Sequence, residues 1–132
     1  GACWARKEVA AVFEPGDHGS TYSGTAIATA AVNAVITEMR RLDAPALATR
    51  QGARLAAGLG SLPGVAAVRG KGLLLAAELS EKPAADAYRE LLAEGLVTNA
   101  VTPTALRFAP PLTVTDEEID EAVALVAKVL AS

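Results

Sequence analysis

The residues best suited to chemistry lie in one short loop, Asp17–Thr25, which is rich in hydroxyl side chains and glycine. The apolar spacing predicts that a helix begins directly after this loop. The first N–H groups of a helix lack partners within it, and the helix dipole favours negative charge there. The serine and threonine hydroxyls of the loop could therefore help to bind a phosphate. The same composition is also typical of an ordinary N-capping loop, so both interpretations stay open.

A second candidate is Arg107, which lies within the apolar stretch Ala105–Ala109. Burying a charge in a short apolar strand is costly unless the charge is paired. The planar guanidinium could bind a carboxylate through two parallel hydrogen bonds. Alternatively, Arg107 lies on an edge strand and extends its charged end into water.

The elements that must position these groups follow from the spacing of apolar and turn-forming residues. In the first half of the chain we expect a short buried strand at 2–5 and helices at 7–13, 25–42 and 45–59. In the second half we expect strand material at 65–79 with a kinked entry at 69–72, and a helix from 84 that ends by 95. Strands at 96–100 and 105–109 and a final helix complete the chain. The final helix has the clearest start, because Thr115 and Glu118 can form a capping box. Helices in succession over a small sheet predict an α+β fold.

Composition excludes several classes of protein. Of the 132 residues, 52% are hydrophobic and 20% are charged, as in a soluble globular domain and unlike a disordered tail. The net charge is −3, the lysines and arginines are scattered, and aromatic residues make up only 4%. We therefore expect no nucleic-acid partner and no binding to a membrane surface. No apolar run approaches the roughly 20 residues that span a bilayer.

Single residues limit the chemistry further. Cys3 is the only cysteine and His18 the only histidine, so neither an internal disulfide nor a Cys/His metal site is expected. We expect Cys3 to be a buried core thiol, Trp4 to be a packing residue and Glu78 to be solvated at a strand end. A single cysteine is compatible with a reducing cytoplasm. Because the chain begins with Gly1 rather than methionine, it is expected to be a piece of a longer polypeptide.

Three segments carry motifs that occur together in one enzyme family. They are His18–Gly24 (HGSTYSG), Arg69–Leu75 (RGKGLLL) and Leu106–Leu112 (LRFAPPL). In this order and at these separations they resemble the class III aminotransferases, which are fold-type I pyridoxal-phosphate enzymes, and the acetylornithine group matches best. Gly1 and Ala2 resemble the end of the family's "PIGA" strand. The resemblance covers essentially the whole chain.

The resemblance implies roles for three residues. Thr21 matches the threonine that binds the cofactor phosphate across a homodimer interface. Ser20 matches the serine that contacts the N-acetylated substrate. Arg107 matches the arginine that meets the substrate α-carboxylate, or an internal glutamate when no substrate is bound. The lysine that carries the cofactor would lie before Gly1, so the resemblance places no catalytic residue in this chain.

For the fold, the resemblance implies a small C-terminal domain whose mostly antiparallel sheet is covered by helices on one face. Residues 1–24 would be the edge of a large cofactor-binding domain, with a strand, a short helix and the phosphate-contact loop. Residues 25–132 would hold the long linking helix and the small domain. Without its packing partners, the 1–24 segment is expected to be displaced, swapped or buried in an oligomer.

For the complete enzyme, the resemblance implies cytoplasmic amino transfer from N-acetylornithine to 2-oxoglutarate in arginine biosynthesis, with this chain inactive alone. One departure concerns Thr25-Ala26, which stands where the family usually has Asn-Pro; Thr25 can still cap the helix. The alternatives are a sister enzyme acting on ornithine, succinylornithine or 4-aminobutyrate, a non-catalytic α+β binding or dimerisation module, and a degenerate gene fragment without activity.

Overall fold

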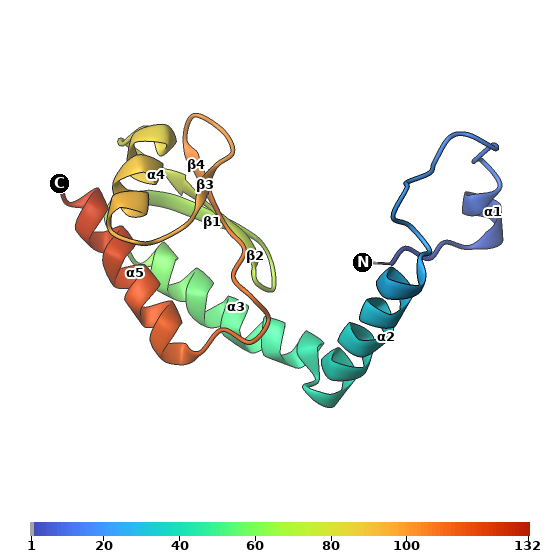
Figure 1. The fold of residues 1–132 in the computed structure, drawn as a ribbon. Coiled ribbons are helices and arrows are strands. Elements are labelled where there is room, and N and C mark those ends of the chain that lie inside the picture. Colours follow the sequence, from blue (N-terminus) through green and yellow to red (C-terminus); the bar gives the residue numbers. More distant parts are fainter. Residues whose placement is uncertain (1) are drawn as a thin grey trace. The chain divides into compact units, whose positions relative to one another are not determined.

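The computed structural model describes residues 2–132, which form two compact units divided between Leu42 and Asp43 (Figure 1). Gly1, whose resemblance to a family strand was noted above, lies outside the described residues. The predicted domain boundary after Gly24 concerns the complete enzyme and stays a prediction. None of the helices in the described chain combines the length and the apolar character needed to cross a membrane.

The first unit contains the short helix α1 (Lys7–Ala10) and the long helix α2 (Ala26–Arg41), joined by the loop of interest. Thr25 is the N-cap of α2, and Arg40 and Arg41 lie in its last turn, where the helix dipole favours positive charge. The long helix predicted at 25–42 is therefore confirmed. No described residue of this unit is buried.

Three predictions for the start of the chain are wrong. Residues 2–5 form no strand, and both Cys3 and Trp4 are exposed, Trp4 to 84%. A strand is stable only when neighbouring strands accept and donate its backbone hydrogen bonds. The described part of the first unit contains no other strand, so this apolar segment has neither a hydrogen-bonding partner nor a core to enter.

The second unit is built on a four-stranded antiparallel sheet. Its strands are β1 (Val65–Lys71), β2 (Leu74–Leu79), β3 (Asn99–Ala100) and β4 (Ala105–Phe108), in the spatial order β1-β2-β4-β3. Every neighbouring pair is antiparallel. The α+β fold with a small antiparallel sheet is thereby confirmed, although the strand predicted at 96–100 is ordered as a strand only in its last two residues.

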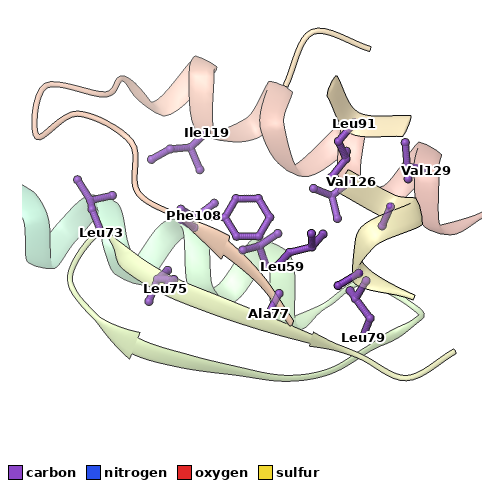
Figure 2. Packing of buried hydrophobic residues seen from close by; sticks show 14 residues of the cluster. Leu59, Leu73, Leu75, Ala77, Leu79, Leu91, Phe108, Ile119, Val126 and Val129 are labelled. Carbon is purple, nitrogen blue, oxygen red and sulfur yellow. The ribbon is translucent and has the colours of Figure 1, made fainter. Parts of the chain in front are cut away.

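Helices cover one face of this sheet. They are α3 (Ala44–Gly60), α4 (Ala84–Ala93) and α5 (Asp116–Leu130). Figure 2 shows their side chains, among them Leu59 and Val126, meeting Leu75, Ala77 and Phe108 of the strands. Along β2 the residues alternate between buried and more exposed, as a strand with one covered face requires. The opposite face carries polar groups.

The segment predicted as a kinked strand entry, Arg69–Gly72, instead ends β1 and begins a tight hairpin turn. Gly72 and Leu73 form the two-residue connection between the paired residues Lys71 and Leu74. The φ of Gly72 is 56°, in the left-handed region that a side chain disfavours. A β carbon at Gly70 would lie 2.1 Å from the Leu74 carbonyl oxygen, so the hairpin needs glycine there too.

The start of α5 follows the sequence pattern closely. The Thr115 hydroxyl accepts from the Glu118 N–H at 3.2 Å, and the Thr115 N–H donates to Glu118 Oε2 at 2.8 Å. The capping box is therefore confirmed. The buried Gln51 of α3 adds a tertiary contact, because its amide donates to the Val114 carbonyl and to Asp116 Oδ1.

Candidate functional site

The hydroxyl loop ahead of α2 is wound into successive turns. The Tyr22 N–H donates to Ser20 Oγ at 3.3 Å, and the Ser23 N–H donates to the Ser20 carbonyl at 3.2 Å. Thr21 is exposed, and its hydroxyl has no hydrogen-bond partner in the described part of the chain. Ser20 and Thr21 therefore lie side by side in one loop, each with a hydroxyl proton still available to a ligand.

Thr25, rather than the usual Asn-Pro of the family, starts the helix. Its hydroxyl accepts from the Ala28 N–H at 3.3 Å and donates to the Tyr22 carbonyl at 3.3 Å. This cap satisfies one of the free N–H groups of α2 and ties the loop to the helix. Because Thr25 does the capping, Ser20 and Thr21 are not needed for it.

An open hollow of about 550 Å³ lies beside this loop within the first unit. It is lined by Ala2, Ser20, Tyr22, Ser23, Gly24, Ala28, Thr29, Val32 and Asn33. Thr21 is not part of the lining. The His18 ring lies beside that of Phe13, with ring centroids 5.1 Å apart.

Arg107 lies in β4, in the second unit, opposite Ala76 of β2 on one side and Asn99 of β3 on the other. Since β4 is an interior strand, the alternative that placed Arg107 on an edge strand is wrong. The residue is exposed on the uncovered face of the sheet. Among the described residues its guanidinium forms no ion pair, so it remains available to an anion.

Arg107 shares this face with a charged cluster that the sequence interpretation missed. Arg69 donates to Glu78 Oε1 from Nε at 3.0 Å and from Nη2 at 2.6 Å, and the Thr104 hydroxyl donates to Glu78 Oε2 at 3.0 Å. The hydrogen bonds from Arg69, and then from Thr104, lower the pKa of Glu78 below its ordinary value. Glu78 was expected to be simply solvated. The sequence interpretation missed this cluster because the spacing of residues does not show which strands pair.

Two of the lysines, Lys82 and Lys128, form ion pairs with glutamates of α4 and its C-terminal end. Lys82 pairs with Glu90 at 2.7 Å and Lys128 pairs with Glu94 at 2.5 Å, so both amines are held in surface ion pairs. Within residues 2–132 no cluster of His, Cys, Asp and Glu could hold a metal ion. The candidate ligand-binding groups of the sequence therefore lie in separate units, the hydroxyls of Ser20 and Thr21 in the first and the guanidinium of Arg107 in the second.

The fold of the chain is that of aminotransferase domains. The acetylornithine aminotransferase of Elizabethkingia anophelis matches with a TM-score of 0.78 and 27% identity, over 96% of this chain and 35% of that one. The ornithine δ-aminotransferase of Plasmodium falciparum matches with a TM-score of 0.77 and 32% identity, over 96% of this chain and 34% of the other. The chain thus has the α+β architecture of aminotransferase domains.

The family model described as aminotransferase class-III matches residues 1–130, and the chain belongs to this family. The acetylornithine aminotransferase of Gloeobacter violaceus is 42% identical over 130 residues, which are 95% of this chain and 32% of that protein. The chain spans only about a third of the length of the curated relatives it matches. Class III aminotransferases use pyridoxal phosphate, which confirms at the level of the family the cofactor that the motifs indicated. A solved ornithine aminotransferase from Toxoplasma gondii contains it at partial occupancy.

Proposed function

We propose that this chain is the C-terminal portion of an acetylornithine-type aminotransferase. The complete enzyme transfers the δ-amino group of N-acetylornithine to 2-oxoglutarate, forming N-acetylglutamate semialdehyde and glutamate in cytoplasmic arginine biosynthesis. Similarity to acetylornithine aminotransferases from several bacteria, at 40–42% identity, supports this substrate. The ornithine aminotransferase of Bordetella pertussis is 41% identical over 133 residues, which makes ornithine the second candidate.

Arg107 carries the proposal. Both substrates of this reaction carry carboxylates, and a guanidinium can bind a carboxylate through two parallel, charge-assisted hydrogen bonds. The flanking strands hold the backbone of Arg107 on both sides, so the binding group projects from a rigid element. Its charge is not consumed by a pair within the described chain, which suits it to a ligand that must come and go.

Thr21 fits the phosphate of the cofactor, and Ser20 fits the N-acetyl group of the substrate. Phosphate oxygens accept hydrogen bonds, and the exposed Thr21 hydroxyl has a proton to donate and no partner among the described residues. Thr21 would hold the phosphate across a homodimer interface, and the neighbouring Ser20 would contact the N-acetyl group of the substrate. When bound, pyridoxal phosphate supplies the electron-accepting ring through which the amino group passes.

The chain alone is inactive in this proposal, because the lysine that carries the cofactor belongs to the preceding polypeptide. Addition of pyridoxal phosphate followed by borohydride reduction should label no single lysine of the 132-residue chain. The gene upstream should encode a lysine followed by a glycine-rich, proline-containing strand that ends in Gly-Ala. A natural gene that begins near Gly1 would instead favour a non-catalytic binding or dimerisation module.

Steady-state kinetics of the complete enzyme tests the role of Arg107. Arg107→Met removes the guanidinium, so the KM for glutamate should rise at least about tenfold, the size expected for losing a charged hydrogen-bonding group. Arg50→Met is the matched control, because Arg50 is an exposed arginine of α3 outside this face. An unchanged KM in Arg107→Met would refute the carboxylate-binding role. The substrate preference is read separately: Ser20→Ala should raise the KM for N-acetylornithine more than that for ornithine.

A further inference from the structure

Glu78 lies between two arginines on the uncovered face of the sheet. Ala76 of β2 is paired with Arg69 of β1 on one side and with Arg107 of β4 on the other. Glu78 is two residues further along β2, so its side chain projects from the same face as Ala76. Arg69 and Arg107 are therefore both diagonal cross-strand neighbours of Glu78, at the roughly 7–8 Å separation that long side chains can bridge.

Both oxygens of the Glu78 carboxylate accept hydrogen bonds from residues other than Arg107. Its Oε1 accepts both hydrogen bonds from Arg69, at 3.0 and 2.6 Å, and its Oε2 accepts from the Thr104 hydroxyl at 3.0 Å. The Glu78 side chain retains only 26% of its exposure, compared with 60% for Arg69. Ala76 lies between Arg69 and Arg107 on neighbouring strands, so only a methyl group separates the two arginine side chains.

We propose that Arg69, assisted by Thr104, is a positioning residue that holds Glu78 away from Arg107 and thereby keeps the Arg107 guanidinium available for a substrate carboxylate. This inference rests on the proposed function of Arg107. A glutamate released from Arg69 is an internal carboxylate within reach of Arg107 and competes with the substrate for it. The Arg69 side chain acts on binding without contacting the substrate itself.

The competing carboxylate is charged at neutral pH, because the ordinary pKa of a glutamate is only 4.5 and the hydrogen bonds from Arg69 and Thr104 lower the pKa of Glu78 further. An anion beside a free guanidinium would pair with it if nothing else held it. Arg69 donates twice to Glu78 Oε1 and the Thr104 hydroxyl donates to Oε2, so groups other than Arg107 hold both carboxylate oxygens.

The test is a pair of variants of the complete enzyme. In Arg69→Met, Glu78 loses both hydrogen bonds from Arg69 and turns toward Arg107. The KM for glutamate should then rise about fivefold with kcat unchanged, because the largest free energies found for exposed ion pairs correspond to about this factor. In Arg69→Met/Glu78→Gln the competing charge is gone, and the KM should return to the wild-type value. Recovery by a second substitution distinguishes positioning from a general loss of structure.

Two further variants keep the test decisive. Thr104→Val removes only the hydroxyl donor and is nearly isosteric on an exposed loop, so it should raise the KM in the same direction by a smaller factor. Arg54→Met breaks the exposed ion pair with Asp120 between α3 and α5 and should leave the KM unchanged. If Arg69→Met and Thr104→Val both leave the KM unchanged, or if the double variant stays impaired, the inference is wrong.

Nuclear magnetic resonance on the 132-residue chain separates this inference from the proposed function. The Arg107 Nε–H signal should shift in Arg69→Met, as it does when a guanidinium gains a carboxylate partner, and should return in Arg69→Met/Glu78→Gln. This readout needs no substrate. If Arg107→Met leaves the enzyme's KM unchanged while the signal shifts as expected, the carboxylate-binding function fails but the competition for Arg107 stands. If the signal does not move, the competition itself is absent.

Discussion

Gly52 of α3 packs closely against the β1–β2 turn in the second unit. A β carbon at this position of α3 would lie 2.2 Å from the Gly72 carbonyl oxygen in the β1–β2 turn. That turn is part of the hairpin that carries Arg69 and Glu78. A single missing methyl group therefore lets α3 and the hairpin pack directly against each other.

The substitution Gly52→Ala should lower the free energy of unfolding by about 1–3 kcal/mol, because the helix or the hairpin must move to accommodate the methyl group. Urea denaturation measures the change. Gly60→Ala is the matched control in the same helix, since its β carbon would meet nothing closer than Val68 Cγ2 at 3.8 Å. Equal effects of the two substitutions would show that the contact at Gly72 is not tight in solution.

At the same scale, residue type indicated what the candidate groups can do but not what surrounds them. The hydroxyls of Ser20 and Thr21 and the guanidinium of Arg107 were identified from their chemistry, and all three are exposed. The partnership of Arg69 with Glu78 was not predicted. It joins residues nine positions apart through the register of two strands, and register depends on how the whole hairpin aligns rather than on local composition.

At the scale of elements, local signals were sufficient wherever an element is determined by its own residues. Helices α2 and α5 begin at the capping threonines Thr25 and Thr115, as the sequence indicates. Strands were harder to place, because their length depends on their neighbours. Only Asn99–Ala100 of the predicted 96–100 strand pairs, since β3 borders only the short strand β4.

Ion pairs between elements predict how stability responds to acid. Hydrogen bonds from Lys82 and from Arg54 lower the pKa values of Glu90 and Asp120 below the ordinary values of 4.5 and 3.8. A carboxyl group whose pKa is lower in the folded state stabilises the fold above its unfolded pKa. That contribution is lost as the pH falls through the lowered folded value, so the second unit should be less stable in acid.

Urea denaturation at neutral pH and at pH values below 3.8 should therefore show a decrease in unfolding free energy on acidification. Arg54→Met removes the donor that lowers the pKa of Asp120, so this variant should show a smaller decrease than the wild type. A decrease of the same size in both proteins would mean that the Arg54–Asp120 pair does not contribute to the pH dependence.

At the scale of the whole molecule, the two units differ in how they are stabilised. The second unit has a continuous buried cluster that includes Leu59, Leu106 and Val126 (Figure 2). The first unit has no buried residue among those described, and it exposes large apolar side chains such as Trp4 and Ile27, the latter to 85%. Sequence patterns predict the long helices of both units, but they do not reveal whether a partner surface for an apolar face is present.

This difference predicts unequal protection from hydrogen exchange in the 132-residue chain. An isolated helix of the length of α2 is only marginally stable without tertiary packing, so its amides should be protected about tenfold or less. Amides of α3, β2 and α5 should exchange far more slowly, through unfolding of the buried cluster. Mass spectrometry of deuterium uptake resolves the two groups by peptide. Protection of α2 equal to that of α5 would show that α2 packs against a partner surface, either within the chain or in a second copy. Dilution of the protein would separate these two cases, because only a contact between copies weakens with dilution.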